Sequence, residues 1–515
     1  MSFYHRLSSL LKAHCLKLMI KIAVIGSGIS GLAVAVRMRL RGYEVDVFEK
    51  NDYPGGKLSA FEIHCNSDES KIYRFDAGPS LFTMPQYVEE LFQLAKEPIK
   101  NYFSYSKIED VCHYFWRDGK NAIAWADKEK LTNEFSDKLG ADESDILEIF
   151  SQAKNKYDIS GRIFLENSLH KIKTWLKRDV LLALIQTYKL DIFSSMHTIH
   201  VNLAHKNPKL IQFLDRFATY NGSNPYKASG ILSMIPHFEH GFGTYYPEGG
   251  MHIITQAIYK LGEHLGVNYY FNTEVNEIRV ENKKVTGIKI NNQNIHIDYN
   301  AVISNMDVYY TYSELLKDAK TAEKIKKQER SSSAIIFYWG INRAFKQLGL
   351  HNIFFSENYK EEFDALSKGE IVSDPTVYIN ITSKLTVTDA PPDCENWFVM
   401  INAPFDSGQN WEEIKNKLRA NVISKLSNAL VCNFESLIEA EQIMLPPDIE
   451  SKTASYKGAL YGTSSNSMTS AFMRHPNFSR KIKSLYFCGG SVHPGGGIPL
   501  CLLSAKIVDD VFLKI

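Results

Sequence analysis

The chain has 515 residues, of which 44% are hydrophobic, so it is long and apolar enough to bury the core of two or three domains. Its 59 basic and 58 acidic residues give a net charge of +1, so nothing in the overall charge argues for a nucleic-acid-binding protein. Seven scattered cysteines without a C-x-x-C pair indicate reduced thiols on the cytosolic side, and the sequence predicts no metal site.

The first 18 residues carry basic residues among leucines and no acidic residue. This pattern fits either a leader upstream of a start at Met19 or a weak basic surface anchor. We expect a dispensable leader, because the first strand begins only at Lys21. The chain contains no run of ~18 apolar residues, the length that a membrane span requires.

Residues 21–49 contain every part of a dinucleotide-binding unit in the expected order. A short apolar strand leads into Gly26 and Gly28, which allow a tight turn and a close approach to a pyrophosphate, and Gly31 allows the next helix to pack closely. A second strand ends at Glu49, where a carboxylate can accept ribose hydroxyls. The binding residues expected in this unit are Gly26, Gly28, Ser30, Gly31, Glu49 and Lys50.

The turn after Glu49 distinguishes between dinucleotides. Gly55 and Gly56 are followed by Lys57, and this pattern is not typical of nicotinamide-dependent enzymes. The segment resembles the FAD-binding flavoproteins of the amine oxidase and phytoene desaturase superfamily, in which the base is usually Arg. The resemblance assigns the cofactor turn to Gly55, Gly56 and Lys57. Lys57 replaces the usual Arg, and it can supply a point charge to a phosphate but not a bidentate contact.

Two further motifs, near opposite ends of the chain, are similar to those of bacterial and fungal phytoene desaturases. One is the D-x-G-P-S segment at 76–80, and the other is the G-x-x-x-H-P-G-x-G-I-P ending at 489–499. Many flavin amine oxidases carry Asp where this chain has Gly490, which favours the carotenoid branch. The resemblance implies non-covalent FAD contacted by Gly78, Pro79, Ser80, Gly489, Gly490, Gly497 and Ile498.

This arrangement predicts an α/β fold with a discontinuous, Rossmann-like FAD-binding domain made of 19–100, 241–307 and 440–515. A helix with one apolar face over 254–265 and a hairpin around Asn282 return the middle of the chain to it. By resemblance, Val275 contacts the adenine. Residues 101–240 and 308–439 should form an inserted α+β substrate domain, in which three apolar strands floor a long apolar pocket.

Residues 160–220 are predicted to be helical. Within them, basic residues and one Trp precede a leucine cluster over 171–185. This pattern fits a helix lying on an anionic membrane, and it fits a solvated helix packed on the core almost equally well. A lipid-soluble substrate favours the membrane, so we expect a helical, membrane-facing part and a protein peripherally attached on the cytoplasmic side.

The resemblance implies an FAD-dependent carotenoid desaturase, closest to the hydroxycarotenoid 3,4-desaturases, which forms a conjugated double bond in a C40 isoprenoid. Alternatives are a phytoene desaturase proper, a carotene isomerase, saturase or oxidase, and a flavin-bearing protein without turnover. The electron acceptor would be oxygen or a quinone. No catalytic base is assigned; Asp307, Glu248 and His493 are candidates, each with an equally good or better structural interpretation.

Overall fold

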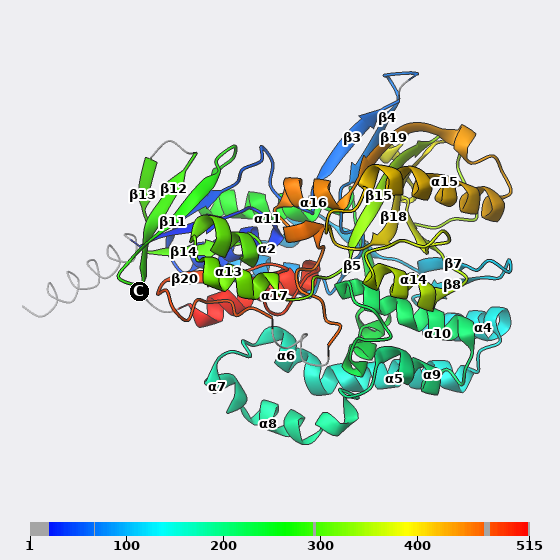
Figure 1. The fold of residues 1–515 in the computed structure, drawn as a ribbon, viewed down its shortest axis with the longest axis horizontal. Helices are drawn as coiled ribbons and strands as arrows, with labels where there is room; N and C mark the ends of the chain where they lie inside the picture. The colour runs from blue at the N-terminus through cyan, green and yellow to red at the C-terminus, as the bar shows by residue number, and fades with distance from the viewer. Residues whose placement is uncertain (1–19, 66, 292–294, 468–473, 513–515) are drawn as a thin grey trace, which may run out of the picture.

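The computed structural model describes residues 20–65, 67–291, 295–467 and 474–512. The leader expected at 1–18 lies outside these residues. Two large sheets organise the rest. Figure 1 shows the sheet that contains β14 on one side, the sheet that contains β15 and β18 on the other, and helices below both.

The first sheet is entirely parallel and has the strand order β10-β2-β1-β14-β20. Three of its strands, β1, β14 and β20, are nearly continuous apolar runs because they are buried on both faces, whereas the edge strand β10 is partly exposed; all five strands are short. They are β1 (Lys21–Ile25), β2 (Glu44–Phe48), β10 (Asn268–Tyr270), β14 (Ala301–Ser304) and β20 (Leu485–Phe487). All five strands come from the three segments predicted to form the FAD-binding domain.

Helices cover one face of this parallel sheet and a small antiparallel sheet covers the other. α2 (Ile29–Leu40), α11 (His252–Leu265) and α17 (Ile498–Val511) pack on the side chains of Ile22 and Val24. On the opposite face, Ala23 packs against β11 (Val275–Glu281) and β12 (Lys284–Ile290), which pair with β13 (Ile295–Asp298). The predicted hairpin therefore forms, and its turn uses Asn282 and Lys283 at positive φ.

The second sheet has seven strands in the order β19-β15-β18-β17-β16-β7-β8. The strand β15, which lies next to the edge strand β19, is buried along its whole length. The strands are β7 (Asp110–Phe115), β8 (Asn121–Trp125), β15 (Ser333–Ile341), β16 (His351–Phe354), β17 (Val377–Asn380), β18 (Glu395–Ala403) and β19 (Ile438–Met444). One face packs on α15 (Trp411–Leu430). The other face packs on the hairpin of β3 (Ala60–His64) and β4 (Ile72–Asp76) and lines the cavity described below.

Two boundaries differ from the expected domain limits. The strand β19 crosses the limit set at 440, because its backbone continues the sheet beside β15. The β3–β4 hairpin was assigned to the cofactor domain, yet its buried rings pack on the seven-stranded sheet, with Phe75 against Tyr338.

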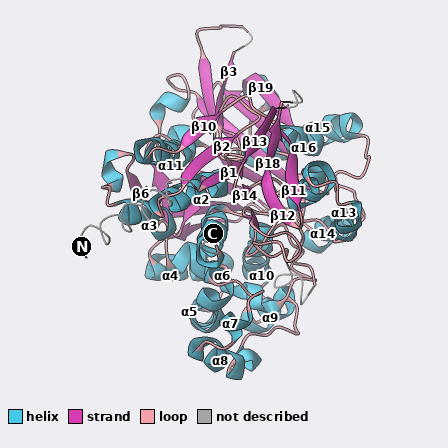
Figure 2. Ribbon diagram, turned by 90° about the vertical axis from the view of Figure 1, so that its left-hand side faces the viewer, coloured by secondary structure: helices cyan, strands magenta, loops and turns pink. Residues whose placement is uncertain are grey.

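The segment 160–220 forms several short helices rather than long ones. The predicted amphipathic stretch 171–185 divides into α7 (Ile172–Trp175) and α8 (Arg178–Ile185), because Lys177 has extended backbone between them. The neighbouring helices are α5 (Glu143–Lys156), α6 (Arg162–Glu166), α9 (Met196–Leu203) and α10 (Pro208–Asp215). Figure 2 shows α7 and α8 at the end of the molecule opposite β3. Among the described residues, no helix combines the length and apolarity needed to cross a bilayer.

Candidate cofactor and substrate site

Two positions in and after the turn between β1 and α2 require glycine. Gly26 has a φ of +90°. A Cβ on Gly31 would lie 2.1 Å from the Gly26 carbonyl oxygen, so any side chain there would push α2 away from the strand. The close helix packing predicted for Gly31 is thus a steric requirement of this fold.

Asn305, which sequence reasoning did not assign to the site, joins this turn to the C-terminal one. It follows β14, and its Nδ2 donates to the Cys488 carbonyl at 3.2 Å. A Cβ on Gly28 would lie 2.6 Å from its Oδ1, and one on Gly489 would lie 2.5 Å from its Nδ2. A polar residue directly after a buried parallel strand, at the edge where such sheets bind ligands, was the available signal.

Glu49 is buried and retains capacity to accept a hydrogen bond. Its carboxylate accepts from the backbone N–H and the hydroxyl of Ser27, both at 2.9 Å, and from the Asn51 N–H at 3.0 Å. A carboxylate offers about four lone-pair positions, so these contacts leave room for another donor. Glu49 also lines a cavity, and a ribose hydroxyl is a donor of the required kind.

These turns surround a cavity of about 480 Å³, the main cavity. All of the predicted binding residues except Gly31 line it. They are Gly26, Gly28, Ser30, Glu49, Lys50, Gly55, Gly56, Lys57, Gly78, Pro79, Ser80, Val275, Gly489, Gly490, Gly497 and Ile498. Gly31 lies behind them in the packing of α2. The structure brings these residues together, and their individual contacts to a cofactor stay predictions.

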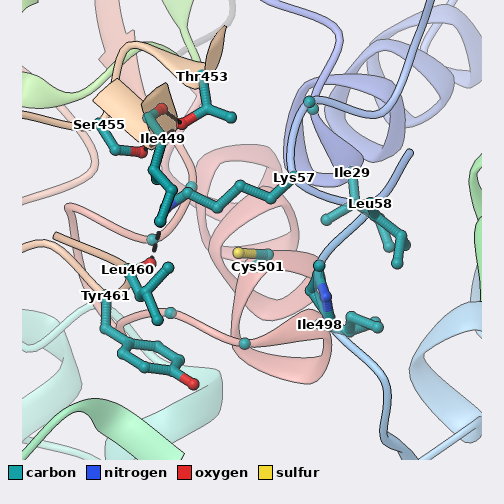
Figure 3. A pocket seen from close by; sticks show the side chains of 18 of the residues that line it. Ile29, Lys57, Leu58, Ile449, Thr453, Ser455, Leu460, Tyr461, Ile498 and Cys501 are labelled. Atoms are coloured by element: carbon teal, nitrogen blue, oxygen red, sulfur yellow. Dashed lines mark hydrogen bonds between the residues drawn. The ribbon is translucent and has the colours of Figure 1, made fainter. Parts of the chain in front are cut away.

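Two cations lie near this wall without a carboxylate in ion-pair range among the described residues: Lys57, which is partly buried and lines the main cavity, and Arg474, which is buried just behind it. Lys57 donates to the Leu460 carbonyl at 2.7 Å, and burial lowers the pKa of Lys57. Figure 3 shows its side chain reaching across the cavity between Leu58 and Leu460. Arg474 donates to the carbonyls of Tyr461 and Gly490, and burial lowers the pKa of Arg474 to about 10. A phosphate-bearing ligand would supply the missing negative charge.

The main cavity continues from the glycine turns into the substrate domain. There it is lined by apolar side chains of the seven-stranded sheet, among them Ile336, Ile353 and Phe398. A second, small cavity of about 130 Å³ lies on the helical side. Phe164 and Leu165 of α6 line one side of it, and the turn at 493–500 lines the other. Thr83, Tyr220, Gly496, Gly497 and Pro499 line both cavities.

The three candidate proton acceptors have different surroundings. Asp307 lines the main cavity, but its carboxylate caps the next helix through the Tyr309 N–H at 2.8 Å. Glu248 is exposed, accepts from Ser104 and does not line either cavity. His493 lines the small cavity, hydrogen-bonds the Asn167 carbonyl at 2.9 Å, and has its pKa lowered to about 4 by burial. All three side chains thus have structural partners, and no catalytic base is assigned.

Comparison with known proteins identifies the fold and the cofactor. The model of the flavin containing amine oxidoreductase family matches residues 29–361. The chain belongs to this family. The predicted flavoprotein family is confirmed, and so is the α/β fold of its FAD-binding domain, since a putrescine oxidase structure aligns with a TM-score of 0.61 at 13% identity, over 95% of this chain and 98% of its own.

Two relatives of this flavoprotein extend over nearly its whole length. The 1-hydroxycarotenoid 3,4-desaturase of Flavobacterium sp. (strain P99-3) is 49% identical over 95% of this chain and 98% of its own. The 4,4'-diapolycopene oxygenase of Methylomonas sp is 31% identical over 95% and 97%, respectively.

The residues of the main cavity fit FAD. The fit rests on Glu49, with its free acceptor capacity, on the cation Lys57 in the wall, and on turns in which a Cβ would collide with backbone or with Asn305. When bound, FAD supplies an acceptor for two electrons. The protein is an FAD-dependent oxidoreductase.

Proposed function

We propose that this flavoprotein is a carotenoid desaturase that introduces a conjugated double bond into a C40 isoprenoid, by 3,4-desaturation of a hydroxycarotenoid. The observation that carries the proposal is the 49% identity, over almost the full length of both chains, to a protein named for that reaction. The apolar extension of the main cavity supports it, because a polyene chain needs an apolar channel beside the cofactor.

The protein's own contribution to such a reaction is positioning. An allylic C–H bond beside a polyene loses a hydride readily, because conjugation spreads the positive charge that remains. The strands β15 and β18 hold the chain through apolar contacts such as Ile336 and Phe398, which also exclude water. A phytoene desaturase, an isomerase, a saturase and an oxidase on the same scaffold are alternatives, and the oxygenase named among the relatives favours the last of these.

The substrate would enter from a membrane. On and after α7 and α8, large apolar side chains are exposed: Ile172 80%, Leu176 71%, Ile185 72%, Tyr188 75% and Phe193 88%. The exposed cations Lys173, Lys177 and Arg178 lie among them. We call these eight residues the docking surface. Apolar side chains that insert and cations that attract anionic headgroups are what a peripheral membrane protein requires.

The small cavity supports the same direction of entry. Its lining includes Phe164 and Leu165, close in sequence to α7, and it shares residues with the main cavity. In this proposal the enzyme lies on the cytoplasmic face of an anionic membrane. The electrons then pass to oxygen or to a quinone dissolved in the same bilayer.

The function is tested with purified enzyme, FAD and liposomes that contain a 1-hydroxylated acyclic carotenoid, under air or with an added quinone. The expected product has two hydrogens fewer and absorbs at longer wavelength, as resolved by chromatography and mass spectrometry. A Gly28→Val variant, which closes the cofactor turn against Asn305, is the inactive control. Unchanged mass, an isomerised product or an oxygenated product would each reject the desaturase in favour of another activity.

A further inference from the structure

A buried ion pair lies in the wall of the main cavity, whose part in the substrate domain is lined mainly by apolar side chains. Arg216 Nη2 contacts Glu239 Oε1 at 2.6 Å, and the two side chains are 8% and 2% exposed. Tyr220 donates to the same carboxylate. Burial opposes ionisation of Glu239, yet the charge of Arg216 holds the pKa of Glu239 well below its usual range. The Arg216 guanidinium also lies 4.1 Å from the ring of Phe217, so the pair is fixed in place.

A buried histidine in the same wall has one ring nitrogen without a partner. His351 is 2% exposed, and its Nδ1 is held by the Tyr378 hydroxyl at 2.8 Å and by Asn380 Nδ2 at 3.3 Å. Because Asn380 donates, Nδ1 accepts, and a neutral ring then carries its proton on Nε2. Burial lowers the pKa of His351 to about 4, which keeps the ring neutral at physiological pH. Nε2 has no hydrogen-bond partner among the described residues.

This donor lies close to the cofactor wall. Tyr378, which holds His351, is hydrogen-bonded to Ser80 at 2.6 Å. Ser80 directly follows Gly78 and Pro79 in the turn that lines the main cavity. Two successive hydrogen bonds therefore connect the cofactor turn to the His351 ring.

A purely structural role accounts for the ion pair but not for His351. The Glu239 carboxylate is paired with Arg216 and Tyr220, although Arg216 Nε has no partner among the described residues. The buried His351 N–H has no acceptor either, and such a group destabilises a fold unless a ligand provides one. The missing partner has to be a hydrogen-bond acceptor on a ligand that is otherwise apolar enough to enter the channel. A hydroxyl oxygen on an otherwise hydrocarbon substrate meets this requirement.

We propose that His351 donates a hydrogen bond from Nε2 to the substrate hydroxyl and thereby selects isoprenoids hydroxylated near the reacting bond. This proposal rests on the proposed function and identifies what distinguishes its substrate. In a 1-hydroxy chain oxidised at C3 and C4, the oxygen is three bonds from C3, about 4 Å away. Recognition must therefore occur beside the cofactor, where His351 lies.

Two amide substitutions separate the two ring nitrogens of His351. His351→Gln places its amide near the Nε2 position, and His351→Asn places it near Nδ1, so only the glutamine keeps the donor. The measured quantity is the ratio of kcat/KM for a 1-hydroxylated carotenoid to that for its counterpart without the hydroxyl, both in liposomes with FAD-loaded enzyme. His475→Asn is the control, because His475 is partly buried and has a similarly lowered pKa but lines neither cavity.

We expect wild type, His475→Asn and His351→Gln to prefer the hydroxylated substrate, and His351→Asn to lose about tenfold of that preference. Flavin absorbance reports whether each variant is folded. A wild type that shows no preference for the hydroxylated substrate would reject the proposal, whether or not His351→Asn retains flavin. Equal ratios in His351→Asn and wild type would overturn it. An enzyme that converts neither carotenoid although it binds FAD would overturn the proposed function instead, so the two failures are distinguishable.

Discussion

At the scale of single residues, the site combines groups that are already paired with groups that keep capacity for a ligand. Glu49 belongs to the second kind, because the Ser27 and Asn51 donors orient its carboxylate without saturating it. Asn305 belongs to the first, since it is packed between two glycine turns. Replacing each kind should therefore have different consequences: loss of affinity for Glu49, and loss of the shape of the turns for Asn305.

Replacing Glu49 with Gln should weaken FAD binding by about 1–3 kcal/mol, because charge-assisted hydrogen bonds to the ribose hydroxyls are lost. Equilibrium dialysis followed by flavin fluorescence measures the effect. Glu44→Gln is the matched control, since Glu44 begins the strand that Glu49 follows but pairs with Lys21 at the surface. Equal flavin retention by both variants would show that Glu49 does not hold the ribose.

At the scale of elements, the sequence predicted those features that a short stretch of residues encodes by itself. The glycine turns, β1, β2 and the hairpin at Asn282 follow from short patterns, and the structure contains all of them. The break at Lys177 did not follow, because nothing in its neighbours' helical spacing marks an extended residue. Arg216, Glu239 and His351 were not found either, because they come from separate segments and each is ordinary in its own.

The docking surface is an element-scale prediction. Changing Lys173, Lys177 and Arg178 together to Gln should weaken binding to anionic liposomes by about 3 kcal/mol, since each cation contributes about 1 kcal/mol near such a surface. Lys171 is left intact, because its ammonium lies 4.0 Å from the ring of Phe478. Sedimentation with liposomes measures binding, and flavin content should not change.

The control for that variant removes the same charge elsewhere. Lys320, Lys324 and Lys327 are exposed on or beside α13 (Ala319–Lys326), which packs on the cofactor domain. Their replacement with Gln should leave liposome binding as in wild type. If both triple variants sediment alike, the solvated interpretation of α7 and α8 is correct and the membrane contact lies elsewhere.

At the scale of the whole molecule, FAD would contact three segments of chain that are distant in sequence. The main cavity is lined by residues of the turns at 26–30 and 55–57, by Val275, and by residues of the turn at 489–498. A ligand that binds only when all of them are assembled stabilises the folded state against the unfolded chain. Flavin content and stability should consequently change together.

Adding FAD at 100 times its dissociation constant should raise the free energy of unfolding by about 2.7 kcal/mol. Urea titration followed by tryptophan fluorescence measures this. FMN, which lacks the adenosine half that Glu49 and Val275 are predicted to contact, should give a smaller increase at equal concentration. No difference between apoprotein and FAD-loaded protein would contradict the fit of the cofactor.

Buried histidines make stability depend on pH. Burial lowers the pKa of His351, His475 and His493 to about 4 each, against about 6.5 in an unfolded chain. The unfolded state therefore binds more protons between these values, so stability is fully present above pH 6.5 and falls as the pH drops toward 4. Each histidine contributes up to about 3 kcal/mol to this loss.

His475→Gln isolates one of these contributions. Between pH 4.5 and 6, its free energy of unfolding should change with pH less steeply than that of wild type, by up to about 1.4 kcal/mol per pH unit. Denaturant titrations at a series of pH values give both slopes. Parallel slopes would mean that His475 titrates normally in the folded protein.

The position of β20 at the edge of the parallel sheet has a consequence for biosynthesis. Its partner β14 ends at Ser304, and β20 begins at Leu485, so roughly 180 residues emerge from the ribosome between them. At a translation rate of about 5–20 residues per second, a nascent chain spends roughly 10–40 s with the edge of β14 unpaired. During this time the C-terminal turn of the cofactor site has not yet been synthesised. Prematurely terminated chains would thus never retain a flavin, and a colourless, aggregation-prone fraction during expression would report incomplete synthesis.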